Sequence, residues 1–582
     1  MGISRLTRLE PYGSDAGREY EADVLVIGGG PAGAWAAISA AANKARVVLA
    51  DKGFCGTSGA TAPSGTGVWY VEPDAQTREK AKADRYKMGG ELAEHAWMDR
   101  VLEQTWTNIH QLAEWGYPFP ADAMGNSQRT SLQGPEYMRL MRKQVKAAGV
   151  RILDHSPALE LLVNEDGSVG GATGVNRLTG QTWAVRAGAV IMATGGCAFL
   201  SRALGCNVLT GDGQLMAAEA GAELSGMEFS NAYGMGPAFS SVTKSLFYSW
   251  ANFYYADGTL IEGAGSHRGR GIVAQTLQSQ PVFARLDRAD EQIRAWMRTA
   301  QPNFFVSFDR RNIDPFTQFF PVTLRLEGTV RGTGGLNIVD ENCATNVPGL
   351  YAVGDAATRE LICGGFTGGG SHNAAWALSS GFWAGAGAAD YGRRAAKSFA
   401  KRQLWHAGRT GLHANGGQSW DPEEVIKSVQ AEVFPYEKNW TRQGDALEGA
   451  LLRLDTLWHR ISRGAAAGSA SAAVRAREAA AMLATSRWMY RSALARTETR
   501  GMHRRSDHAA PDPSQRHRII SAGLDEVWID KKQVLDQPSG TAGTERNAAA
   551  AKPGGGRAAP ERSIAAAHKA AASDTTTQLE AA

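Results

Sequence analysis

Cysteine, long apolar stretches and net charge are all scarce in this chain, and each scarcity narrows the class of protein. Only five cysteines occur in 582 residues, and no two form a C-x-x-C pair, so neither a disulfide framework nor a zinc or iron–sulfur ligand set is visible. No apolar run of about 18 residues is present, and the N-terminal segment lacks the apolar run of a secretory signal. A formal net charge of +4 does not favour nucleic acid as the main partner. We therefore expect a cytoplasmic protein with reduced thiols, no transmembrane segment and no metal site.

The chain does contain a strand–turn–helix–strand pattern near its N-terminus. The segments DVLVI, PAGAWAAISAAANKA and RVVLADK predict a strand, a helix and a second strand, because β-branched runs surround an alanine-rich run without breakers. Helical periodicity returns at 99–115 and 136–148, and a series of strands spans 150–193. This alternation predicts an α/β fold.

The rest of the chain changes character three times. Residues 228–332 are rich in aromatic residues, Gly, Ser and Asn, and we expect them to form an inserted domain. A strand-like LYAVGDAA follows at 350–357, and residues 420–500 are helical by spacing and composition. From about Gln537 small and polar residues dominate. Such a composition cannot bury enough apolar surface to offset the cost of ordering, which predicts a disordered tail.

The strongest motif is Gly28-x-Gly30-x-x-Gly33, which directly follows the first predicted strand and opens the helix. The first glycine permits a tight turn, the second lets backbone amides approach a pyrophosphate, and the third lets helix and strand pack closely. The pyrophosphate is then expected at the positive end of the helix. Asp51 ends the next strand, 18 residues after Gly33, where it can accept hydrogen bonds from an adenosine ribose. The motif therefore predicts dinucleotide binding.

Two later segments favour FAD over NAD as the dinucleotide. Ala193-Thr194-Gly195-Gly196 follows a buried strand, and GLYAVGDAA at 349–357 is a second strand end far along the chain. An extended FAD molecule needs such a distant contribution, whereas a nicotinamide dehydrogenase does not. Because no second G-x-G-x-x-G occurs, a separate NAD(P)H domain is not expected. We therefore predict FAD as the cofactor.

Seven motifs then occur in order between about residues 20 and 530: GGGPAGAWAA, ATGG, LTGDG at 209–213, LIEG…HRGRG at 260–271, GTGGLNI at 332–338, GLYAVGDAA and ARTETRGMHRR at 495–505. As a set they resemble the flavoprotein subunit family of fumarate reductase and succinate dehydrogenase, which also includes L-aspartate oxidase and the adenylylsulfate reductase alpha subunit. The resemblance implies a Rossmann-like FAD-binding domain interrupted by an α+β capping domain, a helical domain after it, and an active site where FAD meets the cap. The predicted boundaries are 20–227 and 333–395 for the FAD-binding domain, 228–332 for the cap, 396–533 for the helical domain and 534–582 for the tail.

Departures from the family pattern bear on the cofactor and the substrate. Covalent members carry a His-Thr pair after the second strand, whereas residues 56–60 read GTSGA, which implies non-covalent FAD. Two family histidines that contact a dicarboxylate are replaced within 230–233 and 330–331, and the substrate-clamping arginine is replaced within 366–372. The turn GGFTGGGSH at 364–372 is more similar to adenylylsulfate reductase alpha subunits. The resemblance therefore implies a member near that branch, without the usual C4-dicarboxylate site.

The resemblance also assigns candidate site residues. Arg268 lies in the segment matching a family motif whose arginine exchanges a proton beside the flavin, although an arginine can also hold an anionic substrate. His372 begins a small-residue helix expected at the pyrimidine end of the flavin, where a histidine suits proton transfer. His267 is a third catalytic candidate. The residues expected to bind FAD are Gly28, Gly30, Pro31, Ala32, Gly33, Asp51, Lys52, Thr57, Ser58, Gly59, Ala193, Thr194, Gly195, Gly196, Asp212, Gly354, Asp355, Ser371, His372 and Asn373.

One further segment is expected to be structural. Arg496 and Arg500 lie in ARTETRG, which matches a family segment beside the cap, and we expect them to form inter-domain ion pairs with Glu498. The cysteines near the flavin-binding segments are expected to be small buried hydrophobes rather than catalytic groups.

These features predict a two-electron oxidation or reduction of a small, anionic substrate by FAD. Because no cluster ligands and no NAD site are visible, electrons are expected to pass through a separate iron–sulfur, ferredoxin-like protein. One alternative within the enzyme class is re-oxidation by oxygen or fumarate, as in L-aspartate oxidase. Two others are a flavin-binding electron-transfer subunit without substrate chemistry of its own and a structural protein that retains a vestigial fold.

Overall fold

The computed structural model describes residues 10–13, 17–121, 125, 127–243, 245, 247–266, 269–367, 371–396, 402–412, 419–464 and 469–534. The predicted disordered tail, apart from residue 534, lies outside the described residues.

The central element is an eight-stranded mixed sheet in the order β16-β6-β7-β8-β1-β2-β5, with β15 also paired to β8. Its middle is parallel, because β1 pairs in parallel with both β2 and β8, and β8 pairs in parallel with β15. Its strands are β1 (Arg18–Ile27), β2 (Val47–Ala50), β5 (Arg151–Leu153), β6 (Ala158–Val163), β7 (Val169–Val175), β8 (Thr182–Met192), β15 (Leu350–Ala352) and β16 (Trp405–His406). The predicted strand–helix–strand unit and the return of LYAVGDAA to the same sheet are both observed. The α/β fold class is therefore confirmed.

Two helices of small residues cover the parallel part of the sheet. Helix α2 (Pro31–Ala42) begins with a proline, whose fixed φ suits the first helical position, and α12 (Ser371–Ala396) packs against it. A Cβ atom at Gly381 of α12 would lie 2.3 Å from the carbonyl oxygen of Ala32, so a glycine is required for the two helices to approach so closely. Helices α4 (His95–Glu114) and α5 (Gly134–Ala147) pack against α12 and α2, respectively.

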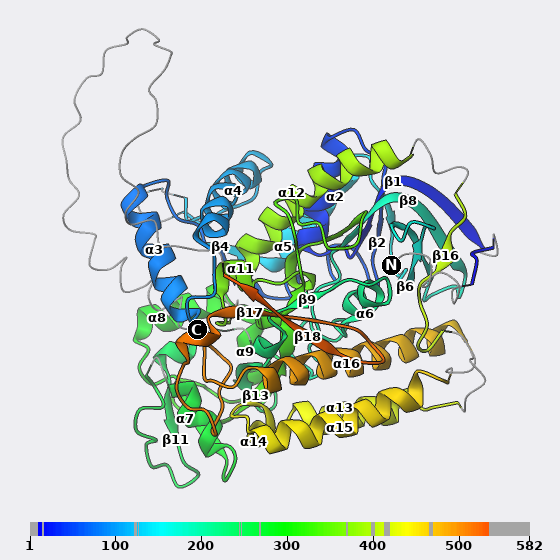
Figure 1. The fold of residues 1–582 in the computed structure, drawn as a ribbon. Coiled ribbons are helices and arrows are strands. Elements are labelled where there is room, and N and C mark those ends of the chain that lie inside the picture. Colours follow the sequence, from blue (N-terminus) through cyan, green and yellow to red (C-terminus); the bar gives the residue numbers. More distant parts are fainter. Residues whose placement is uncertain are drawn as a thin grey trace, which may run out of the picture.

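A second, antiparallel sheet lies in the segment predicted to be the cap. Its strands pair in the order β10-β13-β12-β11, and Figure 1 shows them in green, away from the large sheet. The elements are β10 (Ala232–Pro237), β11 (Asn252–Tyr254), α7 (Gly269–Thr276), β12 (Val282–Arg285), α8 (Glu291–Ala300), α9 (Pro302–Asp309) and β13 (Phe320–Glu327). Aromatic residues fill its core, with the rings of Phe304 and Phe308 centred 5.1 Å apart. The exact domain boundaries remain predictions.

The C-terminal region is helical, as expected. Helix α16 packs against α13 and α15, and the three run alongside one another in Figure 1. Helix α16 is alanine-rich and buried on nearly all sides, which explains its weak amphipathic pattern. A third sheet, in the order β14-β9-β17-β18, lies beside it. These elements are α13 (Pro422–Val433), α14 (Tyr436–Asn439), α15 (Gly444–Ile461), α16 (Ala470–Ala495), β9 (Leu224–Ser225), β14 (Gly335–Leu336), β17 (His517–Ala522) and β18 (Trp528–Gln533).

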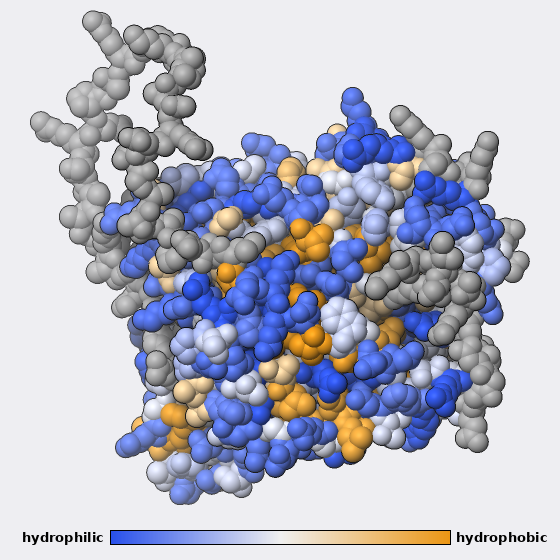
Figure 2. All heavy atoms as spheres, in the orientation of Figure 1, coloured by the Kyte–Doolittle hydropathy of each residue, from blue (hydrophilic) through white to orange (hydrophobic). Residues whose placement is uncertain are grey.

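Several short elements complete the frame around the site. They are the two-stranded pair β3 (Gly65–Gly67) and β4 (Ser131–Gln133), with α3 (Ala75–Met88), α6 (Asp212–Glu219), α10 (Gly328–Arg331) and α11 (Glu360–Cys363). Among the described helices, none is long and apolar enough to cross a membrane. Figure 2 shows a face that is largely hydrophilic, with hydrophobic residues in separate areas from its centre down to the C-terminal helices.

Candidate active site

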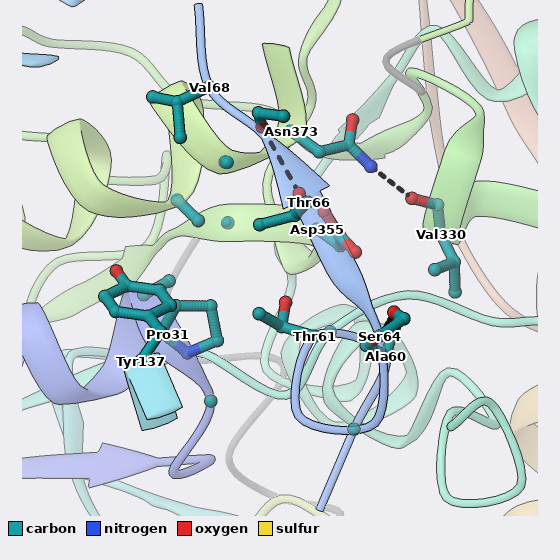
Figure 3. A pocket seen from close by; sticks show the side chains of 18 of the residues that line it. Pro31, Ala60, Thr61, Ser64, Thr66, Val68, Tyr137, Val330, Asp355 and Asn373 are labelled. Carbon is teal, nitrogen blue, oxygen red and sulfur yellow. Dashed lines mark hydrogen bonds between the residues drawn. The ribbon is translucent and has the colours of Figure 1, made fainter. Parts of the chain in front are cut away.

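A cavity of about 1340 Å³ opens at the carboxyl ends of the parallel strands. It is lined by the residues that directly follow β1, β2, β8 and β15, which are Gly28, Asp51, Ala193 and Val353. The carboxyl edge of a parallel sheet is where open α/β folds bind their ligands. Figure 3 shows side chains from several elements around this space, among them Pro31, Tyr137 and Asp355.

The glycine turn forms one end of this cavity. Gly28 has a φ of +111°, and a Cβ atom there would lie 2.2 Å from the carbonyl oxygen of Ala193, so only glycine fits without strain. A Cβ atom at Gly30 would meet nothing within 4 Å, and this residue both lines the cavity and caps α2 without a side-chain hydrogen bond. The first amides of a helix lack intrahelical partners and attract anions. The turn therefore leaves the space and the donors that a pyrophosphate requires.

Asp51 is held in place by three donors. Its Oδ2 accepts from the Gly29 amide at 2.6 Å, and its Oδ1 accepts from the Gly53 amide and from Ser58 Oγ, both at 2.7 Å. Each carboxylate oxygen can accept more than one hydrogen bond, so the group can still receive ribose hydroxyls. Ser58 and Gly59 line the same cavity, whereas Thr57 is exposed and does not.

Lys52 and Asp212 line the cavity as a charge pair. Lys52 Nζ lies 2.6 Å from Asp212 Oδ2 and 2.7 Å from Glu478 Oε1. Against the desolvation of the buried ammonium, these two carboxylates raise the pKa of Lys52 above its usual value. The lysine charge is therefore compensated within the protein, and Lys52 joins the segment after β2 to the first residue of α6 and to α16.

The far end of the cavity is formed by the start of α12 and by α10. Asn373 Nδ2 donates to the carbonyl oxygen of Val330 at 2.9 Å, as Figure 3 shows. Asn373 Oδ1 is buried and has no hydrogen-bond partner among the described residues, which leaves an acceptor for a bound group. Asp355 Oδ1 accepts from Arg359 Nη1 at 2.7 Å. The residues present thus fit an extended dinucleotide from the glycine turn to α12.

The structure brings most of the predicted FAD-binding residues to this one cavity. Those that do not line it are Gly33, Thr57, Gly196 and His372. Gly33 packs against the Gly28 carbonyl and Gly196 against Thr329, so their smallness serves close packing. The remaining predicted residues all line the cavity.

The His372 side chain does not line the cavity and contacts Arg85 and Trp69 instead. Its Nδ1 accepts a hydrogen bond from Arg85 Nη2 at 2.8 Å, and its ring centre lies 4.3 Å from that of Trp69. Burial, followed by the charge of Arg85, holds the pKa of His372 well below its usual value, so the imidazole stays neutral. This placement favours a structural role and gives no support to proton transfer by His372. The other two catalytic candidates, His267 and Arg268, lie outside the described residues.

A second cavity of about 1060 Å³ shares Arg331 with the first. We call it the arginine cavity, because the cationic residues that line it are Lys87, Arg270, Arg331, Arg500, Arg504 and Arg516. The three segments in which family substrate contacts are replaced also meet here, through Asn231–Tyr233, Arg331 and Phe366–Thr367. Sequence reasoning missed this cluster, although the arginine within 330–331 was the signal that could have revealed it.

Positive charge dominates the lining of the arginine cavity. Arg331 Nε lies 3.3 Å from Glu327 Oε2, and Thr367 Oγ1 donates to the Arg331 carbonyl at 2.7 Å. Burial, together with the neighbouring charge of Arg331, lowers the pKa of Arg270 to about 10. The Arg270 guanidinium is therefore still charged at neutral pH, and the gathering of arginines in this lining favours an anion.

Arg496 and Arg500 both pair with Glu498, as expected, but these pairs lie within the ARTETRG segment and do not join two domains; the pair that reaches the segment predicted as the cap is Arg496–Glu228. Arg496 Nη1 lies 2.9 Å and Arg500 Nε 2.7 Å from Glu498 Oε1. Arg496 also pairs with Glu228 at 2.8 Å, and Arg500 Nη1 donates to the Gly90 carbonyl at 2.5 Å. These contacts tie the segment after α16 to the end of α3 and to the segment before β10. All five cysteines are buried and free.

Comparisons with known proteins agree with this geometry. Residues 23–233 match the family model described as FAD binding domain, and residues 436–541 match that of the fumarate reductase flavoprotein C-terminus. The chain is 26% identical over 557 residues to one subunit of the CoM/CoB fumarate reductase of Methanothermobacter marburgensis, covering 86% of this chain and 97% of that protein. It is 27% identical over 561 residues to L-aspartate oxidase of Streptomyces coelicolor, covering 87% of this chain and 92% of that protein.

Solved structures share the fold. Quinol fumarate reductase of E. coli matches with a TM-score of 0.76 and 21% identity, over 89% of this chain and 98% of that one. Adenylylsulfate reductase of Archaeoglobus fulgidus matches with a TM-score of 0.72 and 19% identity, over 91% of this chain and 99% of that one. The family and the cofactor expected from the sequence are thus confirmed. The chain is an FAD-dependent oxidoreductase that belongs to the flavoprotein family of fumarate reductase and succinate dehydrogenase.

Proposed function

We propose that this flavoprotein oxidises or reduces a small anionic substrate, by two electrons, in the arginine cavity. The observation that carries the proposal is the position of Arg331. It lines both the first cavity, which we call the FAD cavity, and the arginine cavity. An anion held by its guanidinium therefore lies next to the cofactor. The ion pair with Glu327, at 3.3 Å, helps to hold this guanidinium in place.

The chain's residues supply binding and electrostatics for this reaction. FAD, when bound, supplies the two-electron chemistry. The amides at the start of α2 and the turn at Gly30 would hold the pyrophosphate, and Asp51 would hold the ribose. Arg331 and Arg270 orient the anion and stabilise negative charge that develops on it. Retention of FAD without a covalent bond is part of the proposal, because the sequence at 56–60 lacks the histidine of covalent members.

A separate iron–sulfur protein is proposed as the electron partner. Several relatives are named as subunits, among them the match in the CoM/CoB fumarate reductase of M. marburgensis and the fumarate reductase flavoprotein of E. coli. The sequence offers one dinucleotide fingerprint and no cysteine spacing typical of a cluster. The cytoplasmic location expected from the reduced thiols stays a prediction.

Anaerobic re-oxidation of the reduced flavin distinguishes the proposed enzyme from an electron-transfer subunit without substrate chemistry of its own. The FAD-loaded protein would be photoreduced and mixed with fumarate, adenylylsulfate and other candidate anions, with no partner protein present. We expect at least one anion to re-oxidise the flavin, and we expect Arg331→Ala to slow that step by about 100-fold with an unchanged flavin content. Arg394→Ala is the control, because Arg394 is exposed on α12 and pairs with Asp390. If the wild type is re-oxidised only through a partner protein, the protein is instead an electron-transfer subunit without substrate chemistry of its own.

A further inference from the structure

One buried arginine joins the wall of the FAD cavity to the short helix that carries Arg331. Arg359 directly precedes α11 and has no exposed surface. Neither cavity counts it among its lining residues. A buried guanidinium is tolerated only where its charge and its donors are matched, so the partners of Arg359 show what it holds.

One nitrogen of Arg359 is directed to the FAD cavity. Arg359 Nη1 donates to Asp355 Oδ1 at 2.7 Å, and Asp355 lines that cavity. The cofactor brings a pyrophosphate with two negative charges to the same space. The positive charge of Arg359 therefore favours the cofactor through the wall, without a contact of its own.

The other nitrogen of Arg359 holds α10 by its carbonyl oxygens. Arg359 Nη2 donates to the carbonyl oxygens of Thr329 and Val330, at 2.9 and 3.2 Å. It also donates to the carbonyl oxygen of Gly332. The last carbonyls of a helix have no partner within that helix, and a cation beside them is favourable. Because Arg331 lies between Val330 and Gly332, its backbone is held on both sides by one side chain.

The main chain adds to this bridge. The Arg359 amide donates to the Thr333 carbonyl oxygen at 2.8 Å, and Thr358 Oγ1 donates to the same oxygen at 3.1 Å. The residues at 329, 330 and 332 are buried, so water could not readily replace the donors of a shortened side chain. The turn that follows α10 is thus fixed to the segment after β15.

We infer that Arg359 is a positioning residue for the reaction: it fixes α10, and with it Arg331, to the Asp355 wall of the FAD cavity. Anion and cofactor then keep one relative geometry. A planar guanidinium suits this task, because its fork serves two directions at once. The inference rests on the proposed function, since it concerns how the anion-binding Arg331 is held.

Arg359→Lys tests the bridge while keeping the charge. A lysine has no fork with which to hold both sides, so we expect FAD to bind within about threefold of the wild-type affinity. The reduced, FAD-loaded protein would be re-oxidised anaerobically by fumarate and by adenylylsulfate over a range of concentrations. We expect the limiting rate to fall about tenfold, because a misplaced Arg331 acts on the reacting geometry. The anion concentration that gives half of the limiting rate should change by less than about threefold.

A pair of variants separates the two sides of the bridge. Arg359→Met removes one positive charge beside the cavity for a doubly charged cofactor, so FAD should bind about tenfold more weakly. Adding Asp355→Asn restores the net charge, and the FAD affinity should return to within about threefold of the wild type. Re-oxidation of this double variant should stay slow, because the carbonyl oxygens of α10 still lack their donor.

Arg487 provides the matched control. It is also buried, and its acceptors are Asp455 and the carbonyl oxygens of Leu524 and Asp525. It lies in α16 and is not among the lining residues of either cavity. Arg487→Lys should lower the thermal midpoint but change neither the FAD affinity nor the limiting rate. Flavin content and thermal midpoint of each variant establish that it is folded.

Two results would overturn the inference while leaving the proposed function intact. One is a wild-type limiting rate in Arg359→Lys. The other is an equal loss of rate in Arg487→Lys, which would reduce the role of Arg359 to general stability. Re-oxidation of the wild type by neither anion would instead contradict the proposed function, and the role of Arg359 toward Arg331 would fall with it.

Discussion

Arg85 Nη2 donates a hydrogen bond to His372 Nδ1 across 2.8 Å, at a site where both side chains are buried. A guanidinium can only donate, so His372 must accept through Nδ1 and carry its proton on Nε2. This contact joins the first turn of α12 to α3. It explains why His372 does not line the cavity, although its neighbours Ser371 and Asn373 do.

The neutral state of His372 predicts an acid-sensitive fold. Burial and the charge of Arg85 hold the pKa of His372 well below its usual value, and the pKa of His503 is lowered by burial and by Arg442. The unfolded chain takes up these protons near pH 6.5 and the folded protein does not. Folding stability therefore falls as the pH drops below about 6.5, by about 1.4 kcal/mol per pH unit for each such histidine.

His372→Gln tests this dependence, because the glutamine oxygen can still accept from Arg85 but cannot titrate. We expect the thermal midpoint of this variant to fall less steeply than that of the wild type between pH 6.5 and 5, with His503 supplying the slope that remains. Parallel declines in the two proteins would show that His372 does not carry the effect.

The protonated state of Glu360 predicts a pH dependence of folding stability that is opposite in sign to that of His372. Its side chain is fully buried, Ser225 Oγ donates to its Oε2 at 2.6 Å, and burial together with the Glu228 carboxylate raises the pKa of Glu360 to about 8. The folded state keeps a proton that the unfolded chain releases near pH 4.5, so stability from this group is lost as the pH rises from about 4.5 to 8. Glu360→Gln, which cannot ionise, should raise the thermal midpoint at pH 8 more than at pH 5.

A matched control for Glu360 is available in α13. Glu423 is exposed, and its hydrogen bond from Arg475 lowers its pKa, so Glu423→Gln should give no gain at pH 8. If Glu360→Gln is as stabilising at pH 5 as at pH 8, the glutamate does not titrate as described.

Flavin should leave the protein completely on acid denaturation. Among the described residues that line the FAD cavity there is no histidine or cysteine, the side chains that most readily bond the flavin ring covalently. After acid precipitation we expect all yellow colour in the supernatant. A coloured pellet would contradict non-covalent binding.

How far the sequence could predict this molecule depends on the range of the contacts involved. The glycine fingerprint, Asp51 and the strand at 350–352 follow from local patterns; Gly28, Gly30, Asp51 and the residue after that strand, Val353, line the cavity. The ion pairs of Arg496 and Arg500 followed from a short motif. The orientation of the His372 side chain could not be predicted from a local pattern, because it is set by Arg85, a residue 287 positions earlier in the chain.

The arginine cavity was harder still to foresee. Its cations come from α3, α7, α10 and the segment that follows α16, and no spacing along the chain marks such a gathering. Lys52 is a second example. Its charge is compensated by Glu478, and only the packing of α16 brings these two residues together.

The most direct test of the account is the flavin content of Gly30→Val, measured beside that of the wild type. A Cβ atom at Gly30 would meet no protein atom within 4 Å, so the variant should fold with a thermal midpoint of its cofactor-free form close to that of the wild type. Gly28→Ala is the contrasting control, because its Cβ would lie 2.2 Å from the Ala193 carbonyl oxygen and should destabilise the fold itself. We predict one FAD per chain in the wild type and almost none in folded Gly30→Val. Stoichiometric FAD in Gly30→Val, or a folded wild type that cannot take up FAD, would contradict the account.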